Sequence, residues 1–172
     1  MTRAEDRIMR IAIIGNSGSG KSTLARQFAV RDGLASLDLD TVAWEPGKIA
    51  IPRSRADAVA DVKAFCEAQD GWVVEGCYAP LVEATFAYSP TLLFLDPGAE
   101  ACLSNCRNRP WEPHKYASKQ EQDTYLDFLL NWVHEYYTRD EDPSLAAHQI
   151  LFDRYSGPKQ RLVVLPGPGF RP

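Results

Sequence analysis

Residues 15–23 read GNSGSGKST, and this stretch decides the fold. It follows the apolar run IMRIAII (8–14) and precedes LARQFAV (24–30), so it joins an expected strand to an expected helix. From position 15 to 22 it matches G-x-x-x-x-G-K-[ST], a loop whose backbone N–H groups converge on an anion at the positive end of the following helix. The stretch therefore predicts a site for the polyphosphate of a nucleotide.

The side chains of this loop have separate expected tasks. Lys21 is expected to reach the β and γ phosphates, and Ser22 to ligate Mg²⁺ through its hydroxyl. Thr23 is expected to assist near the α phosphate. Together these roles make ATP and Mg²⁺ the expected cofactors. The residues expected to bind ATP are Gly15, Asn16, Ser17, Gly18, Ser19, Gly20, Lys21, Ser22 and Thr23.

Length and composition predict one globular domain over 1–172, either monomeric or homodimeric. The 172 residues are 45% hydrophobic and 24% charged, with a net charge of −4. Because this charge gives no basic field, it argues against a nucleic-acid partner and favours a small-molecule acceptor. No apolar segment has signal-peptide or membrane-span length, so a cytoplasmic protein without membrane contact is expected.

Alternating strand-like and helix-like segments predict an α/β fold with a parallel sheet. Helical periodicity covers 54–71, where Val59, Val62, Phe65 and Cys66 form one stripe. Strands are expected at 10–14, 35–39, 72–76, 91–96 and 161–165.

Two further helices are expected in the second half of the chain. The longest carries an aromatic stripe through 125–137, expected to pack in the core, and has a capping box at Ser118 and Glu121. The last is expected to begin at Asp142, acting as N-cap, with Pro143 in its first turn.

The cysteines and histidines show no metal-ligand spacing, so we expect reduced core thiols and histidines that are solvated or packed. The cysteines are Cys66, Cys77, Cys102 and Cys106, and the histidines are His114, His134 and His148.

Two aspartates close the second expected strand, in LDLDT. Asp38 and Asp40 are two residues apart and project to one side at the carboxyl end of the strand, where α/β folds bind ligands. One is expected to hold Mg²⁺ through water, and the other to take the proton of an attacking hydroxyl. Strand-end aspartates also cap helices, which is the alternative interpretation.

With these motifs the chain resembles the small P-loop kinases of the adenylate kinase and shikimate kinase group. Within that group LDLDTVAWEPG (37–47) and WVVEGCY (72–78) look most like the adenylate-kinase-related proteins called DNA topology modulation proteins. The resemblance implies a three-layer α/β/α sandwich with a five-stranded parallel sheet. It also implies an acceptor-binding flap at about 41–70 and a mobile lid at about 107–140.

The resemblance also implies roles for individual residues. It puts Glu75 and Gly76 beside the transferred phosphate, with Glu75 as a further metal ligand. Arg107 and Arg109 fall at the start of the lid, and Arg139 continues the face of the long aromatic helix. These three arginines are expected to neutralise charge on the phosphoryl group as the lid closes. Asp96 is expected only to support the site.

The acceptor pocket is expected between flap and strand ends. Trp44 and Tyr78 flank it or belong to the core, and Arg53 and Arg55 bind an anionic acceptor or are simply solvated. The terminal LPGPGF (165–170) either wraps the adenine or forms a disordered tail.

Two departures from the family pattern bear on the acceptor. EGCYAP (75–80) carries no arginine, which disfavours a nucleoside monophosphate, and it holds only one glycine, which disfavours shikimate. The predicted function is an ATP- and Mg-dependent phosphotransferase acting on a small molecule. The alternative is a nucleotide-binding regulatory protein or slow NTPase without such an acceptor.

Overall fold

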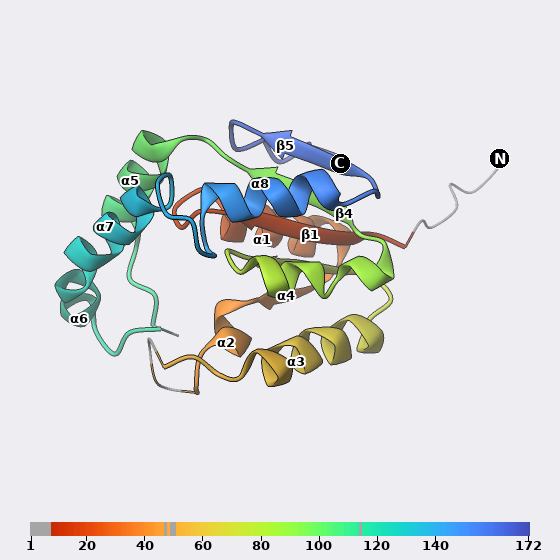
Figure 1. The fold of residues 1–172 in the computed structure, drawn as a ribbon, viewed down its shortest axis with the longest axis horizontal. Coiled ribbons are helices and arrows are strands. Elements are labelled where there is room, and N and C mark those ends of the chain that lie inside the picture. Colours follow the sequence, from red (N-terminus) through yellow and green to blue (C-terminus); the bar gives the residue numbers. More distant parts are fainter. Residues whose placement is uncertain (1–7, 47, 49–50, 114) are drawn as a thin grey trace.

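A computed structural model describes residues 8–46, 48, 51–113 and 115–172. Its centre is a 5-stranded parallel sheet in the order β2-β3-β1-β4-β5 (Figure 1). The strands are β1 (Arg10–Gly15), β2 (Ala35–Asp38), β3 (Trp72–Gly76), β4 (Thr91–Leu95) and β5 (Lys159–Leu162).

Helices cover both faces of this sheet. Alternate residues of β1 point to opposite faces: Ile11 and Ile13 pack with Leu24 and Phe28, and Ile14 packs in the other cluster with Val62 and Leu151. The first face is covered by α1, and the second by α4 and α8, as Figure 1 shows. The helices are α1 (Lys21–Asp32), α2 (Asp40–Ala43), α3 (Arg55–Ala68), α4 (Ala79–Glu83), η1 (Phe86–Tyr88), α5 (Ala99–Arg107), α6 (Lys119–Thr124), α7 (Leu126–Glu135) and α8 (Leu145–Arg154).

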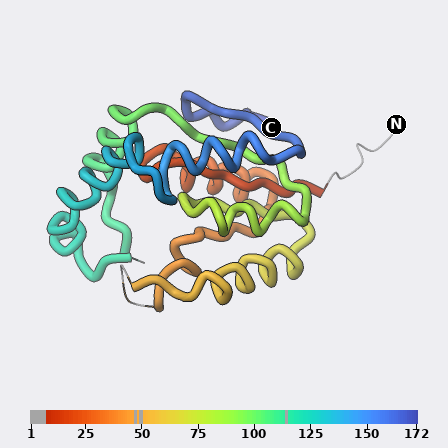
Figure 2. The backbone as a smooth tube through the Cα atoms, in the orientation of Figure 1, coloured from red at the N-terminus to blue at the C-terminus, as the bar shows by residue number. Residues whose placement is uncertain are grey.

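The predicted three-layer α/β/α sandwich with a five-stranded parallel sheet is therefore confirmed. The carboxyl ends of the strands face the side on which α5, α6 and α7 lie, at the left of Figures 1 and 2. The segments predicted as flap and lid thus flank the same edge of the sheet. None of the described helices is both long and apolar enough to cross a membrane.

Helix α3 agrees with its predicted stripe. Ser54 caps it by accepting a hydrogen bond from the backbone N–H of Asp57, at 3.1 Å. Val62 and Cys66 are buried, and Val59 and Phe65 pack against the same core cluster. Since α3 is anchored in the core, its body belongs to the rigid part of the fold.

The predicted long aromatic helix is wrong in two respects. It is divided at Tyr125 into α6 and α7, and half of its stripe is not core, since Tyr125 and Phe128 are 47% and 66% exposed. Only the C-terminal half finds a partner, because Val133 packs against Cys102 and Cys106 of α5.

The capping box is present in part. The Ser118 hydroxyl accepts from the backbone N–H of Glu121 at 3.1 Å. The Glu121 carboxylate, however, accepts from the N–H of Ala117 rather than from that of Ser118, at 2.7 Å.

Two predicted boundaries near the C-terminus are also wrong. Helix α8 is capped by Ser144, whereas the Asp142 carboxylate accepts from the backbone N–H of Ala79 at 3.0 Å. Strand β5 spans 159–162 instead of 161–165, because its partner β4 ends at Leu95, opposite Leu162. The apolar residues that follow have no strand to pair with, and Val164 is 72% exposed.

All four cysteines are buried and free, as expected. Burial raises the pKa of Cys66 to about 11 and that of Cys77 to about 12, which keeps both thiols protonated at neutral pH.

His148 is a packed histidine, and it links three parts of the chain. Its Nδ1 lies 2.8 Å from the hydroxyl of Tyr136, and its Nε2 lies 2.8 Å from the carbonyl oxygen of Cys77. Burial lowers the pKa of His148 to about 4. His134 is exposed, and His114 lies outside the described residues.

Gly76 is required by packing at the end of β3. A Cβ at this position would lie 2.6 Å from the Cβ of Leu39, a residue with no exposed surface. The glycine thus lets the turn after β2 close against β3, which places Asp38 and Asp40 next to Glu75.

We predict that Gly76→Ala lowers the free energy of unfolding by about 1–3 kcal/mol, because the new methyl group overpacks this contact. Urea denaturation measures the loss. Gly169→Ala is the control, since a Cβ there meets nothing within 4 Å. Equal stability of the two variants would contradict the packing role.

We also predict a pH-dependent effect for His148→Gln. Between pH 6.5 and 4 His148 is protonated in the unfolded wild type but largely neutral in the folded protein. Neutral His148 therefore contributes a free energy of folding that is fully present above pH 6.5 and is lost as the pH falls toward 4. The wild type's stability advantage over His148→Gln should therefore shrink by about 2–3 kcal/mol between pH 7.5 and 4.5. The free energy of unfolding of both proteins is measured by denaturation at the two pH values. A difference between wild type and His148→Gln that is the same at both would contradict this prediction.

Candidate active site

The loop 15–20 connects β1 to α1 in the form the motif predicts. Gly18 and Gly20 adopt φ values of 77° and 98°, in the left-handed region that favours glycine. The first backbone N–H groups of a helix have no partner within it, and at the start of α1 they follow the loop directly, which suits an anion. Lys21 is buried, and its Nζ donates to the carbonyl oxygen of Asn16 at 2.8 Å.

The loop is fastened to α5 and α7 by contacts that the motif does not predict. Asn16 donates from Nδ2 to the carbonyl oxygen of Val133 at 2.9 Å, and Asn105 donates to that of Gly18 at 2.8 Å. A Cβ on Gly18 would lie 2.3 Å from the carbonyl oxygen of Cys102. Helices α5 and α7 therefore hold the shape of the loop, and Asn105 carried no recognisable signal in the sequence.

Ser22 and Glu75 meet directly. The Ser22 hydroxyl donates to Oε1 of Glu75 at 2.7 Å. Glu75 is only 4% exposed, and burial together with the nearby Asp38 carboxylate raises its pKa. Since Asp38 pairs with Glu75 in the register of β2 and β3, the three predicted metal-binding residues lie together at one edge.

The two strand-end aspartates have different surroundings. Asp38 accepts from the backbone N–H of Asp40 at 2.9 Å, so it also stabilises the start of α2. Burial and the neighbouring Asp40 carboxylate raise the pKa of Asp38. Asp40 accepts from the Tyr78 hydroxyl at 2.7 Å. Burial opposes its ionisation, but Lys115 and Tyr78 outweigh burial and lower the pKa of Asp40.

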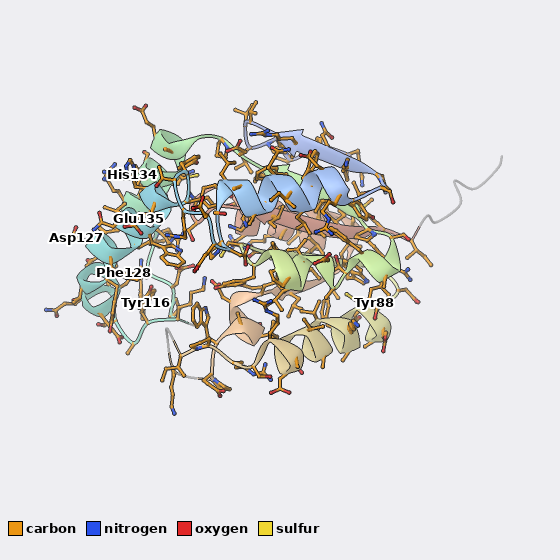
Figure 3. The ribbon with its side chains drawn as sticks, viewed as in Figure 1. Tyr88, Tyr116, Asp127, Phe128, His134 and Glu135 are labelled. Carbon is orange, nitrogen blue, oxygen red and sulfur yellow. The ribbon has the colours of Figure 1, made fainter. Side chains whose placement is uncertain are left out.

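Lys115 is the site residue that the sequence interpretation missed. Its Nζ lies 2.9 Å from Oδ2 of Asp40, 3.7 Å from Oδ2 of Asp38 and 3.6 Å from Oε1 of Glu112. These carboxylates raise the pKa of Lys115 despite its burial. It lies in the connection between α5 and α6, next to Tyr116, which Figure 3 labels on that connection. A lone lysine in a loop carries no motif, so only the folded chain associates it with the aspartates.

The three arginines predicted to act on the phosphoryl group are dispersed. Arg107 is exposed, and Arg109 pairs with Glu112 at 3.3 Å. Arg139 stacks on Trp132, with its guanidinium carbon 3.7 Å from the ring centre, and donates to the carbonyl oxygen of Pro143 at 2.7 Å. In this conformation Arg139 serves to connect the end of α7 to the start of α8.

Two of the predicted acceptor-binding residues, Trp44 and Tyr78, lie together beside Asp40. Trp44 and Tyr78 are in edge-to-face contact, with ring centres 6.1 Å apart. Arg53 is engaged elsewhere, since it pairs with Asp61 at 2.6 Å and donates to the carbonyl oxygen of Val42. Arg55 is exposed at the start of α3.

The C-terminal segment is ordered against α1, which excludes the disordered alternative for 165–170. Leu165 lies beside Gly20 at the loop, and the Phe170 ring lies 6.3 Å from that of Phe28. Arg31 donates to the carbonyl oxygens of Pro168 and Phe170. Between α1 and this segment lies a hollow of about 380 Å³, lined by Thr23, Arg26, Gln27, Val30, Arg31 and Pro168.

Asp96 forms an ion pair with Arg161 of β5, at the carboxyl end of β4. The carboxylate is thus engaged within the sheet, and a supporting role for it in the site stays a prediction.

Comparisons with known proteins give matches in structure only. No protein-family model matches the chain, and no curated protein sequence does. An unliganded sugar kinase from Janibacter sp. HTCC2649 is similar with a TM-score of 0.52 and 15% identity, over 90% of this chain and 84% of that one. Shikimate kinase from Acinetobacter baumannii gives a TM-score of 0.44 and 19% identity, over 86% and 91% of the two chains. Shikimate kinase from Bacteroides thetaiotaomicron gives 0.47 and 17%, over 74% and 78%.

At such low identities a likeness in structure shows the fold and not the reaction. The resemblance to the DNA topology modulation proteins stays a prediction. The chain has the α/β fold of the P-loop kinases, with its loop at the N-terminal end of α1 and its carboxylates at the same edge of the sheet.

Proposed function

We propose that the chain is a Mg²⁺-dependent phosphotransferase that moves the γ phosphate of ATP to a small-molecule acceptor. One observation carries the proposal: the hydroxyl of Ser22, in the phosphate-binding loop, bonds to Glu75, which is paired in register with Asp38. A polyphosphate in the loop would thus end beside carboxylates able to order a metal ion and a nucleophile.

The donor side needs little rearrangement. Lys21 would exchange the carbonyl oxygen of Asn16 for phosphate oxygens, and the N–H groups of the loop would hold the same anion. The hollow beside Thr23 and Pro168 is of a size and apolar character suited to part of the nucleoside. This is consistent with the terminal segment lying against the nucleotide.

The residues present fit Mg²⁺. They offer only hard oxygen donors, the Ser22 hydroxyl and the Asp38 and Glu75 carboxylates, which this ion prefers. Among the described residues no three His, Cys, Asp or Glu side chains form a metal site by themselves. The ion would therefore arrive with ATP, where it neutralises charge on the phosphates.

On the acceptor side the chain's own residues bind and orient. Asp40 is the stronger candidate for the group that takes the acceptor's proton, because its pKa is lowered and Tyr78 fixes its orientation. Trp44 and Tyr78 would supply an apolar wall. Arg107 and Arg109 fall at the start of the predicted lid, and would reach the phosphoryl group only if that segment moves.

The direct experiment is transfer of labelled γ phosphate from Mg-ATP to a mixed pool of nucleosides, nucleotides, sugars and hydroxy acids. The sugar kinase with this fold is the reason to include sugars. A labelled product is expected with the wild type and with Lys119→Met, a control in α6. The product should be lost with Lys21→Ala.

Binding of ATP without any labelled product would contradict the kinase proposal. It would favour the alternative of a nucleotide-binding regulatory protein.

A second experiment assigns the two aspartates, using the acceptor found in the first. Asp40→Asn is expected to lower kcat about 10²- to 10⁴-fold, the usual contribution of a general base, with KM for ATP nearly unchanged. Asp38→Asn is expected instead to raise the Mg²⁺ concentration required for half-maximal rate. If Asp38→Asn instead lowers kcat and Asp40→Asn raises the required Mg²⁺ concentration, Asp38 is the base and Asp40 is the residue that acts on the metal.

A further inference from the structure

The connection between α5 and α6 returns to the sheet at one charged contact. Lys115 is 75 residues from Asp40 in sequence, yet its Nζ lies 2.9 Å from that carboxylate. The ammonium is also within ion-pair distance of Asp38 and Glu112, and the lysine side chain is only 22% exposed. Ion pairs of this burial are better protected from salt than those of the surface.

We propose that Lys115 is a latch. Until an acceptor binds, its ammonium occupies the place of the acceptor hydroxyl and so suppresses transfer of phosphate from ATP to water. This inference rests on the proposed function. It assigns to Lys115 a positioning role, exerted through Asp40 and through the segment that carries the lysine.

The two carboxylate oxygens of Asp40 have different partners. The Tyr78 hydroxyl lies on Oδ1, and the Lys115 ammonium lies on Oδ2. A hydroxyl that donates to the same lone pair of Oδ2 must have its oxygen about 2.7 Å away, which is within the space that Nζ fills at 2.9 Å. Acceptor and ammonium therefore compete for one place.

Removing the ammonium opens the same place to water. A water oriented by Asp40 would attack the γ phosphorus, a P–O bond would form, and the bond to ADP would break. The proton of the water passes to Asp40 and then to solvent, so that the products are ADP, phosphate and a proton. In the transfer reaction the acceptor hydroxyl displaces the Lys115 ammonium and takes its place beside Asp40, so that water has no room there.

Among the described residues of this segment, the other cationic side chains have partners away from the aspartates. Arg109 pairs with Glu112, and Lys119 pairs with Asp123 within α6, where both side chains are 52% exposed. Lys119 is thus a matched control: it has the same charge, lies four residues away, and makes a local ion pair.

The test uses Mg-ATP alone, without acceptor. Lys115→Met keeps most of the aliphatic chain and removes the charge, and we expect it to hydrolyse ATP about fivefold faster than the wild type. Lys115→Arg should restore the low rate, and Lys119→Met should match the wild type. Unchanged or slower hydrolysis in Lys115→Met would overturn the proposal.

Hydrogen exchange of the backbone amides of 111–117 gives a second readout that does not depend on catalysis. We expect exchange about fivefold faster in Lys115→Met than in the wild type, with no change in Lys119→Met. Equal exchange in all three proteins would overturn the latch. If neither the wild type nor the variants bind Mg-ATP, the proposed function is wrong. Hydrogen exchange still decides whether Lys115 holds this segment against the aspartates.

Discussion

The parallel pairing of β1 with both β3 and β4 is the constraint on which the rest of the structure depends. β1 is buried along most of its length, and its neighbours are fixed in register from Arg10 to Gly15. This pairing brings the loop after β1 to the same edge as the end of β3, where Glu75 lies. Because parallel strands all end at that edge, residues separated by more than fifty positions, such as Ser22 and Glu75, meet in one site.

The site combines rigid and less constrained parts. The loop at 15–20 is held on one side by α1 and on the other by α5 and α7, through Asn16, Asn105 and the close contact at Gly18. In contrast, the connection from α5 to α6 touches the aspartates mainly through Lys115. If the chain is the kinase that we propose, binding of the donor needs little movement, whereas admission of an acceptor requires that this one contact be broken.

The sequence predicted those features that depend on local patterns. The motif at 15–22 predicted the loop between β1 and α1, and strand-like runs marked β1, β2, β3 and β4 to within one residue. It also put Asp38 at the carboxyl edge of the sheet, where the loop with Ser22 begins, and the resemblance to the small P-loop kinases added Glu75 there. A period of 3.6 residues identified α3, whose buried face is continuous.

The remaining features depend on tertiary contacts that no local pattern encodes. The aromatic stripe at 125–137 was regular, but only its second half has α5 to pack against, so Phe128 stays exposed. Arg139 continued that stripe as expected, but Trp132 and a backbone carbonyl engage its guanidinium. Lys115 carried no signal, because its partner Asp40 lies 75 residues away, at the start of α2.

The central claim is that the loop would hold the phosphates of ATP while the carboxylates of β2 and β3 order the Mg²⁺ that accompanies them. The most direct measurement is a crystal structure of the protein with Mg²⁺ and a non-hydrolysable ATP analogue. The account predicts the β and γ phosphates within the loop 15–22, the metal on the Ser22 hydroxyl, and Lys21 moved from the carbonyl of Asn16 to phosphate. Phosphates bound outside the loop, or a Lys21 that remains on Asn16, would contradict it.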